Sequence, residues 1–147
     1  MFSGEHTHSL DKQGRVAVPA EMREVLQETY RDEALMVTKA LSGKCLWAFP
    51  MAEWKSLTAK MTEKVLGGKD MMRMRRKFIT PARKCDVDKA GRILLPDPLR
   101  EYAGFDKDVT FASQGRYLEL WRPDEFKRTM AEDAEHDADL LDVAAEL

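Results

Sequence analysis

The feature that most constrains the fold of this 147-residue chain is an internal repeat. Residues 11–24 and residues 88–101 align at an offset of 77 positions, and seven of the fourteen aligned residues are identical. Average residue frequencies would give about one identity by chance. The repeat therefore predicts two copies of one structural unit, and it has to be interpreted before a fold is assigned.

Each copy predicts a strand, a tight turn, a return strand and a short helix, followed by a hairpin. In the first copy the turn is Asp11–Gly14, the return strand is Arg15–Val18, and Pro19 opens the helix. Aspartate suits the first turn position because its carboxylate binds nearby backbone N–H groups, and glycine suits a left-handed fourth position. The corresponding turn of the second copy is Asp88–Gly91.

These elements predict an α+β fold that is rich in β-strands. A β-β-α-β-β unit of about 45 residues is too small to bury a sufficient core alone, so we expect the two units to interlock as a pseudo-dimer within the chain. We place the units at residues 5–52 and 81–124, and a helical connector, broken at Gly67-Gly68, at residues 53–80. Residues 125–147 are predicted to be an acidic C-terminal tail, either a frayed helix or a disordered end.

Charge is distributed unevenly along the chain, although the formal net charge is only −2. Residues 124–147 hold nine acidic and two basic side chains, a net −7, so residues 1–123 carry +5. Residues 69–92 alone hold nine basic side chains against three acidic ones. This distribution indicates a basic body with an acidic tail, which is compatible with a polyanionic partner.

No pattern for an enzyme, a cofactor or a membrane segment is present. Walker loops, dinucleotide-binding glycine patterns and nucleophile elbows are missing, and no apolar run is typical of a signal peptide or a membrane span. Two cysteines and nine methionines fit a reducing cytosol. We therefore expect a cytoplasmic protein that is not an enzyme, has no cofactor and takes no small-molecule substrate.

Two groups of residues are potential metal ligands. Glu5-His6 and His8 could contribute to a metal site, because alternate residues of a strand share a face, but two histidines and one carboxylate favour a polar strand face. Cys45 and Cys85 lack the closely spaced partners of a zinc site, and we expect both to be small buried residues, although a disulfide between them stays open. No metal site is predicted.

Both turns carry a lysine within the turn and an arginine directly after it, which turn formation alone does not require. One interpretation is that these cations are simply solvated. The other is that they contact DNA, because arginine is suited to bidentate contacts with guanine or phosphate and paired tips can engage successive sites on a duplex. The candidate DNA-binding residues are Lys12, Arg15, Lys89 and Arg92, and the turn-structuring residues are Asp11, Gly14, Asp88 and Gly91.

The arrangement of these residues closely resembles the MraZ family. The matching patterns are Met1-Phe2-x-Gly4-Glu5-His6-x-His8-Ser9-Leu10-Asp11-x-x-Gly14-Arg15-x-x-x-Pro19 and Asp88-x-x-Gly91-Arg92-x-x-x-Pro96. The resemblance covers nearly the whole chain and implies two AbrB-like swapped-hairpin modules. The family's Asp-x-x-x-Arg elements, which matter for DNA binding, fall on Asp11/Arg15 and Asp88/Arg92. Ser3 stands where the family commonly has arginine.

The resemblance also implies a function. We expect a sequence-specific DNA-binding transcriptional regulator, a repressor, that acts on the bacterial division and cell-wall gene cluster. It would bind repeated promoter boxes of double-stranded DNA as a ring-like homo-oligomer and associate with the nucleoid. The alternative is an AbrB-type, antitoxin-like interaction module that docks through the acidic tail.

Two charged segments keep two interpretations each. The run Arg73–Lys77 is either a solvated helix face or a second contact with phosphates. The tail is either a self-repelling solubiliser or a competitor of DNA for the basic surfaces.

Overall fold

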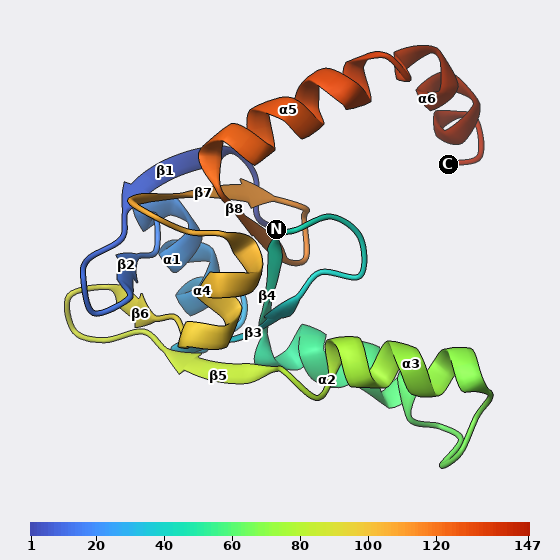
Figure 1. Cartoon of the computed structure of the whole chain (residues 1–147), viewed down its shortest axis with the longest axis horizontal. Helices are drawn as coiled ribbons and strands as arrows, with labels where there is room; N and C mark the ends of the chain where they lie inside the picture. Colours follow the sequence, from blue (N-terminus) through green and yellow to red (C-terminus); the bar gives the residue numbers. More distant parts are fainter.

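The computed structural model describes all residues, 1–147, and contains eight strands and six helices (Figure 1). The strands are β1 (Glu5–Ser9), β2 (Arg15–Ala17), β3 (Ala34–Lys39), β4 (Leu46–Pro50), β5 (Arg83–Asp86), β6 (Arg92–Leu94), β7 (Asp108–Ser113) and β8 (Leu118–Trp121). The helices are α1 (Ala20–Glu28), α2 (Met51–Met61), α3 (Lys69–Phe78), α4 (Asp97–Ala103), α5 (Pro123–Ala134) and α6 (Asp137–Ala144).

The sheet topology confirms that the two copies interlock. Six strands form one sheet in the order β1-β7-β8-β4-β3-β5, and β2 pairs with β6 in a second sheet. The repeat relates β1 to β5, β2 to β6, β3 to β7 and β4 to β8. Reversing the order and exchanging equivalent strands returns the same order, so the sheet has internal two-fold pseudo-symmetry. The first strand of each copy pairs with the third strand of the other copy: β1 pairs with β7, and β5 pairs with β3.

The two sides of each predicted turn pair with each other only next to the turn. At the first turn the N–H of Asp11 donates to the carbonyl of Arg15 at 2.9 Å, and an isolated bridge joins Leu10 to Val16. The return strand β2 instead pairs with its counterpart β6, and Val16 lies opposite Ile93. Both of these side chains are 1% exposed. Pairing across the pseudo-symmetry axis therefore buries apolar residues of both copies in one interior.

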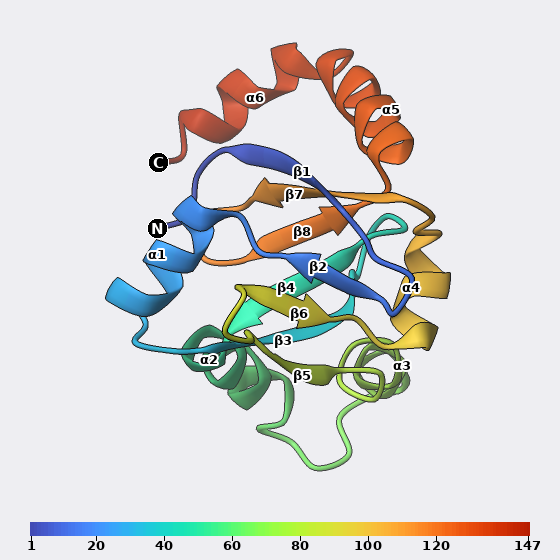
Figure 2. The same ribbon diagram turned by 90° about the vertical axis from the view of Figure 1, so that its left-hand side faces the viewer.

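The main core draws on both copies. It contains 18 buried residues, among them Val18, Leu35, Leu95 and Phe111. In Figure 2 the β2–β6 pair lies across the view, with α1 and α4 on opposite sides of it. Because neither copy holds a closed core of its own, the position of each turn depends on packing contributed by the other copy.

The predicted helical connector is confirmed, including its break. Helix α2 ends at Met61 and α3 begins at Lys69, with Gly67-Gly68 between them. The two helices pack around an aromatic cluster in which the rings of Trp54 and Phe78 stack at 5.2 Å. This cluster attaches the connector to strand β4 through Phe49, whose ring centroid lies 5.8 Å from that of Phe78.

The acidic tail forms helices and is not a disordered end. Helix α5 begins at Pro123, and α6 follows it after a short turn. Phe126 packs on Trp121 at the base of α5, with ring centroids 6.1 Å apart. Beyond this contact the helices lead away from the sheets (Figure 1), and residues 131–147 are all exposed.

Candidate nucleic-acid interface

The two predicted turns have the same hydrogen-bond pattern. Oδ1 of Asp11 accepts the backbone N–H groups of Gln13, at 2.9 Å, and Arg15, at 2.8 Å. Oδ1 of Asp88 accepts those of Ala90 and Arg92, both at 2.9 Å. Each carboxylate thus closes its own turn, as expected for an aspartate at this position.

The glycines close the turns and link each one to the other copy. Gly14 has φ +90° and Gly91 has φ +79°, in the left-handed region that favours glycine. The carbonyl of Gly14 accepts the N–H of Leu95, and the carbonyl of Gly91 accepts the N–H of Val18, both at 2.9 Å. Each turn is therefore fixed by a backbone hydrogen bond from the chain that follows the opposite turn.

Hydrogen bonding keeps both turn aspartates ionised. The pKa of Asp11 lies below its usual value, chiefly because the backbone N–H of Arg15 donates to the carboxylate. The pKa of Asp88 is lowered chiefly by the backbone N–H of Arg92, and then by the nearby guanidinium of the same residue. Because the bound form is the carboxylate, the turns stay closed throughout the neutral pH range.

The four candidate DNA-binding cations lie around these turns and reach solvent. Lys12 and Lys89 are exposed, and Arg15 is partly exposed, with its guanidinium donating to the side-chain oxygen of Gln13. The side chain of Arg92 is 44% exposed. None of the four is sealed inside the protein, so each is accessible to an external anion.

Arg92 lies between the aspartates of both turns, which shows that the two turns share one face. Its Nε lies 3.4 Å from Oδ2 of Asp88, and its Nη1 lies 4.0 Å from Oδ2 of Asp11. These ion pairs are at the surface, where such pairs contribute little to stability. The guanidinium can therefore exchange a carboxylate for another anion at small energetic cost.

Two further arginines, Arg23 and Arg100, support the turns and were missed as site residues. Nη1 of Arg100, on α4, donates to the carbonyls of Leu95, at 2.5 Å, and Gln13, at 3.4 Å. Arg23, on α1, lies against the second turn: a Cβ atom at Gly91 would be 2.6 Å from its Cζ. Arg23 and Arg100 align in the repeat at one of its seven identical positions. This identity is the sequence signal that could have identified them as site residues.

The candidate metal ligands form local polar contacts. Nε2 of His6 lies 3.5 Å from a carboxylate oxygen of Glu21, and Nδ1 of His8 lies 3.0 Å from the carbonyl oxygen of Ala17. Cys45 and Cys85 are buried and form no disulfide, as expected for small buried residues. Burial raises the pKa of the Cys85 thiol to about 12 and also raises that of Cys45.

The basic run on α3 is largely used within the protein. Arg73 pairs with Asp70 at 2.8 Å, and Arg75 donates to the carbonyls of Lys64 and Leu66. Lys77 donates to the carbonyl of Leu41 at 3.1 Å. These contacts favour a structural helix face over a second phosphate-binding surface.

The fold and the turns define a class of protein with two strand-swapped repeats that present two carboxylate-closed basic turns on one face. Comparisons with known proteins agree. A family model described as "MraZ protein, putative antitoxin-like" matches residues 1–75 and 78–144. The chain belongs to the MraZ family.

Curated relatives cover most of the chain. A protein of Marinomonas sp. (strain MWYL1) is 39% identical over 86% of this chain and 83% of its own length. A protein of Carboxydothermus hydrogenoformans is 41% identical over 82% and 80%, and one of Lachnoclostridium phytofermentans is 34% identical over 95% and 94%. Each is named "Transcriptional regulator MraZ". The chain is therefore a transcriptional regulator and not an enzyme. None of its helices is both long and apolar enough to cross a membrane.

Proposed function

We propose that this regulator is a sequence-specific DNA-binding repressor that acts through its two basic turns. The observation that carries the proposal is the shared geometry of the turns: each is closed by an aspartate, and the two turns lie on one face, next to exposed cations. Lysine and arginine side chains at fixed positions can neutralise phosphates and read guanine edges. Because the turns are already ordered, little conformational entropy is lost on binding.

The four cations take different roles in this proposal. Lys12 and Lys89 contact phosphates and position the duplex, while Arg15 and Arg92 reach base edges. One oxygen of Asp11 and one of Asp88 already accept two backbone N–H groups each. Their role is to hold the turns and orient the arginines.

Assembly of several copies would supply the affinity that a single pair of turns lacks. Two turns make few contacts, and linked binding events gain effective concentration only when several sites engage at once. A ring-like homo-oligomer that faces repeated promoter boxes would meet this need. We assign the boxes to the DNA upstream of the bacterial division and cell-wall genes, and we place the protein in the cytoplasm, associated with the nucleoid.

Gel-shift titration of single-arginine variants tests the proposal. Arg15→Ala and Arg92→Ala should each weaken specific binding to the DNA upstream of the protein's own gene by about tenfold or more, because a good arginine contact is worth about 1–3 kcal/mol. Arg128→Ala is the matched control, since this arginine lies on α5 and pairs with Glu125. Unchanged affinity of both turn variants, with circular dichroism like that of the wild type, would refute the proposal.

A protein-interaction role is the second candidate, and the exposed tail favours it. Leu140, Leu141 and Val143 on α6 are 58%, 75% and 61% exposed and lie among carboxylates. An acidic helix with an uncovered apolar side suits a basic partner protein, as in an antitoxin-like module. Co-purification of a stoichiometric basic partner that is lost on deletion of residues 137–147 would support this role. Self-association and DNA retention alone would oppose it.

A further inference from the structure

The pseudo-symmetry of the chain is broken at one pair of equivalent arginines. Arg100 is fully engaged, because its Nη2 pairs with Asp97 while its Nη1 donates to the carbonyls of Leu95 and Gln13. Its side chain is only 22% exposed. At the first turn, therefore, the supporting arginine is neutralised by a carboxylate of its own helix.

Arg23 has no such partner at the second turn. The residue equivalent to Asp97 in the first copy is Ala20, which cannot pair with a guanidinium. Nε of Arg23 is buried and has no hydrogen-bond partner. A buried donor without a partner is destabilising, and a bound water or ion is one of the ways in which such a group is satisfied.

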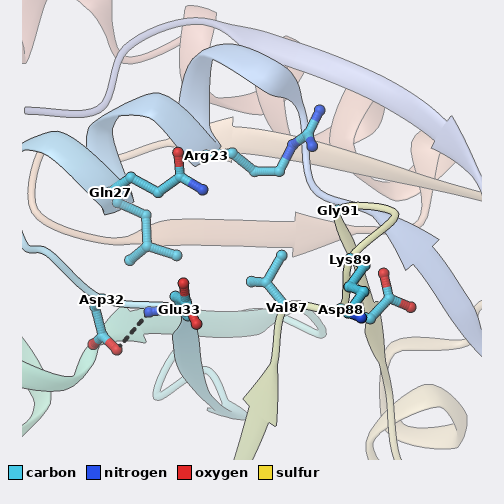
Figure 3. A pocket seen from close by; sticks show the side chains of 9 residues that line it. Arg23, Gln27, Asp32, Glu33, Val87, Asp88, Lys89 and Gly91 are labelled. Carbon is cyan, nitrogen blue, oxygen red and sulfur yellow. Dashed lines mark hydrogen bonds between the residues drawn. The ribbon is translucent and has the colours of Figure 1, made fainter.

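A cavity of about 240 Å³ adjoins this arginine (Figure 3). The guanidinium of Arg23 lies over Gly91, and Lys89 lies on the same side of the cavity, whereas Asp32 and Glu33 lie toward the other end. The lining residues are Arg23, Leu26, Gln27, Asp32, Glu33, Val87, Asp88, Lys89 and Gly91. Asp32 and Glu33 are thus separated from the two cations, whereas Asp88 lies next to Lys89.

Two of the three acids are already occupied. Asp32 accepts the backbone N–H groups of Glu33, Ala34 and Met51. Asp88 accepts those of its turn and contacts Arg92. Glu33 alone has a carboxylate without a partner. At the Gly91 end of the cavity, Arg23 and Lys89 therefore form no ion pair with a carboxylate, and the nearby Asp88 pairs with Arg92.

We propose that Arg23 and Lys89 form a phosphate-binding subsite at the second turn. At the first turn, Asp97 blocks the equivalent subsite because it pairs with Arg100. The inference rests on the proposed DNA-binding function and deepens it, since the phosphate would belong to the DNA backbone. A guanidinium fork and an ammonium group are the side chains that bind phosphate best.

The two turns differ in which arginine is left without a carboxylate partner. In the first turn Arg15 has no carboxylate partner, while Arg100 is paired. In the second turn Arg92 lies between two aspartates, while Arg23 is free. Each turn thus has one guanidinium without a carboxylate partner, Arg15 of strand β2 at the first turn and Arg23 of helix α1 at the second, and both arginines belong to the first copy.

Exchanging the residues that break the symmetry tests the subsite. Ala20→Asp should pair with Arg23 and weaken duplex binding by about tenfold at low salt, and it should reduce the salt slope by about 1. It should fold normally, because an acidic residue in the first turn of a helix is favourable. Asp97→Ala should release Arg100 and strengthen binding.

A double-substitution cycle separates this effect from general charge repulsion. If Ala20→Asp acts by occupying Arg23, it should have no further effect on affinity in an Arg23→Gln background. An equal loss in both backgrounds would overturn the subsite. The subsite would also be overturned if Ala20→Asp had the affinity and the salt slope of the wild type. In that case, tight binding by the wild type that is abolished in Arg15→Ala would still support the proposed function. No DNA binding by the wild type would instead refute that function.

The NMR signal of the buried Arg23 Nε–Hε group reports whether a ligand binds to this guanidinium. Addition of the duplex should shift this signal in the wild type and leave it unchanged in Ala20→Asp. Inorganic phosphate at millimolar concentration provides the second arm. A shift with inorganic phosphate and none with the duplex would overturn the assignment to DNA, because the subsite would then take a free anion.

Discussion

At the scale of single residues, the turns depend on an aspartate and a glycine that the sequence already identified. Asp11 and Asp88 accept the expected backbone N–H groups, and Gly14 and Gly91 adopt left-handed conformations. The repeat marks Arg100 as one of its identical positions, but the sequence does not show what it contacts, because Gln13 lies in the other copy. Local sequence patterns identify the residues that form a turn. A contact between residues 87 positions apart is visible only in the folded structure.

Replacing Gly14 with alanine should open the first turn. The left-handed backbone would strain any L-residue, and the added Cβ would lie 2.5 Å from Cζ of Arg100 and 3.1 Å from the carbonyl oxygen of Leu95. We expect a loss of about 1–3 kcal/mol in the free energy of unfolding, measured by urea titration. Gly68→Ala is the control, because its φ is −94° and nothing lies within 4 Å of the added atom. Equal effects of the two substitutions would contradict this explanation.

The turn aspartates should also give the protein a defined acid sensitivity. Their pKa values in the folded chain lie below the ordinary value of 3.8, so their stabilising contribution is fully present above pH 3.8. It is lost as the pH falls through the lower, folded pKa values. We expect the urea midpoint of the wild type to fall more steeply below pH 4 than that of Asp11→Asn/Asp88→Asn. Parallel curves for the two proteins would show that these carboxylates do not contribute.

At the scale of elements, the sequence predicted the type of nearly every element but not the pairing of the strands. Alternating apolar residues and turn signals are local, and they placed β3 to β8 and the break before α3. The sequences of the three-residue strands β2 and β6 do not indicate which strand each one pairs with. Only the burial of Val16 and Ile93 in a shared interior decides that they pair with each other.

The acidic tail offers a prediction at this scale. Because residues 131–147 are all exposed, deletion of residues 133–147 should leave the thermal midpoint nearly unchanged. If the tail competes with DNA for the basic surfaces, the deletion should tighten DNA binding at low salt, and the gain should shrink as salt rises. The salt dependence of fluorescence anisotropy measures this. Identical curves for the full chain and the deleted chain would show that the tail only solubilises.

At the scale of the whole molecule, the repeat is better described as one interwoven body than as two units in a row. Pairing of β1 with β7 and of β5 with β3 means that each copy completes the sheet of the other. The limits 5–52 and 81–124 stay a prediction about repeat units. This exchange of strands places both basic turns on one face, and we propose that both contact the same DNA.

Site-specific cross-linking shows whether both turns contact one duplex. Single variants Lys12→Cys and Lys89→Cys would carry a photoreactive group, with Lys55→Cys on α2 as the control; Cys45 and Cys85 should not be labelled, because burial raises the pKa of both thiols. Irradiation with one duplex from upstream of the gene should cross-link DNA from positions 12 and 89 and not from position 55. Cross-links from only one turn, or equal cross-linking from the control, would contradict the claim that the two turns bind the duplex together.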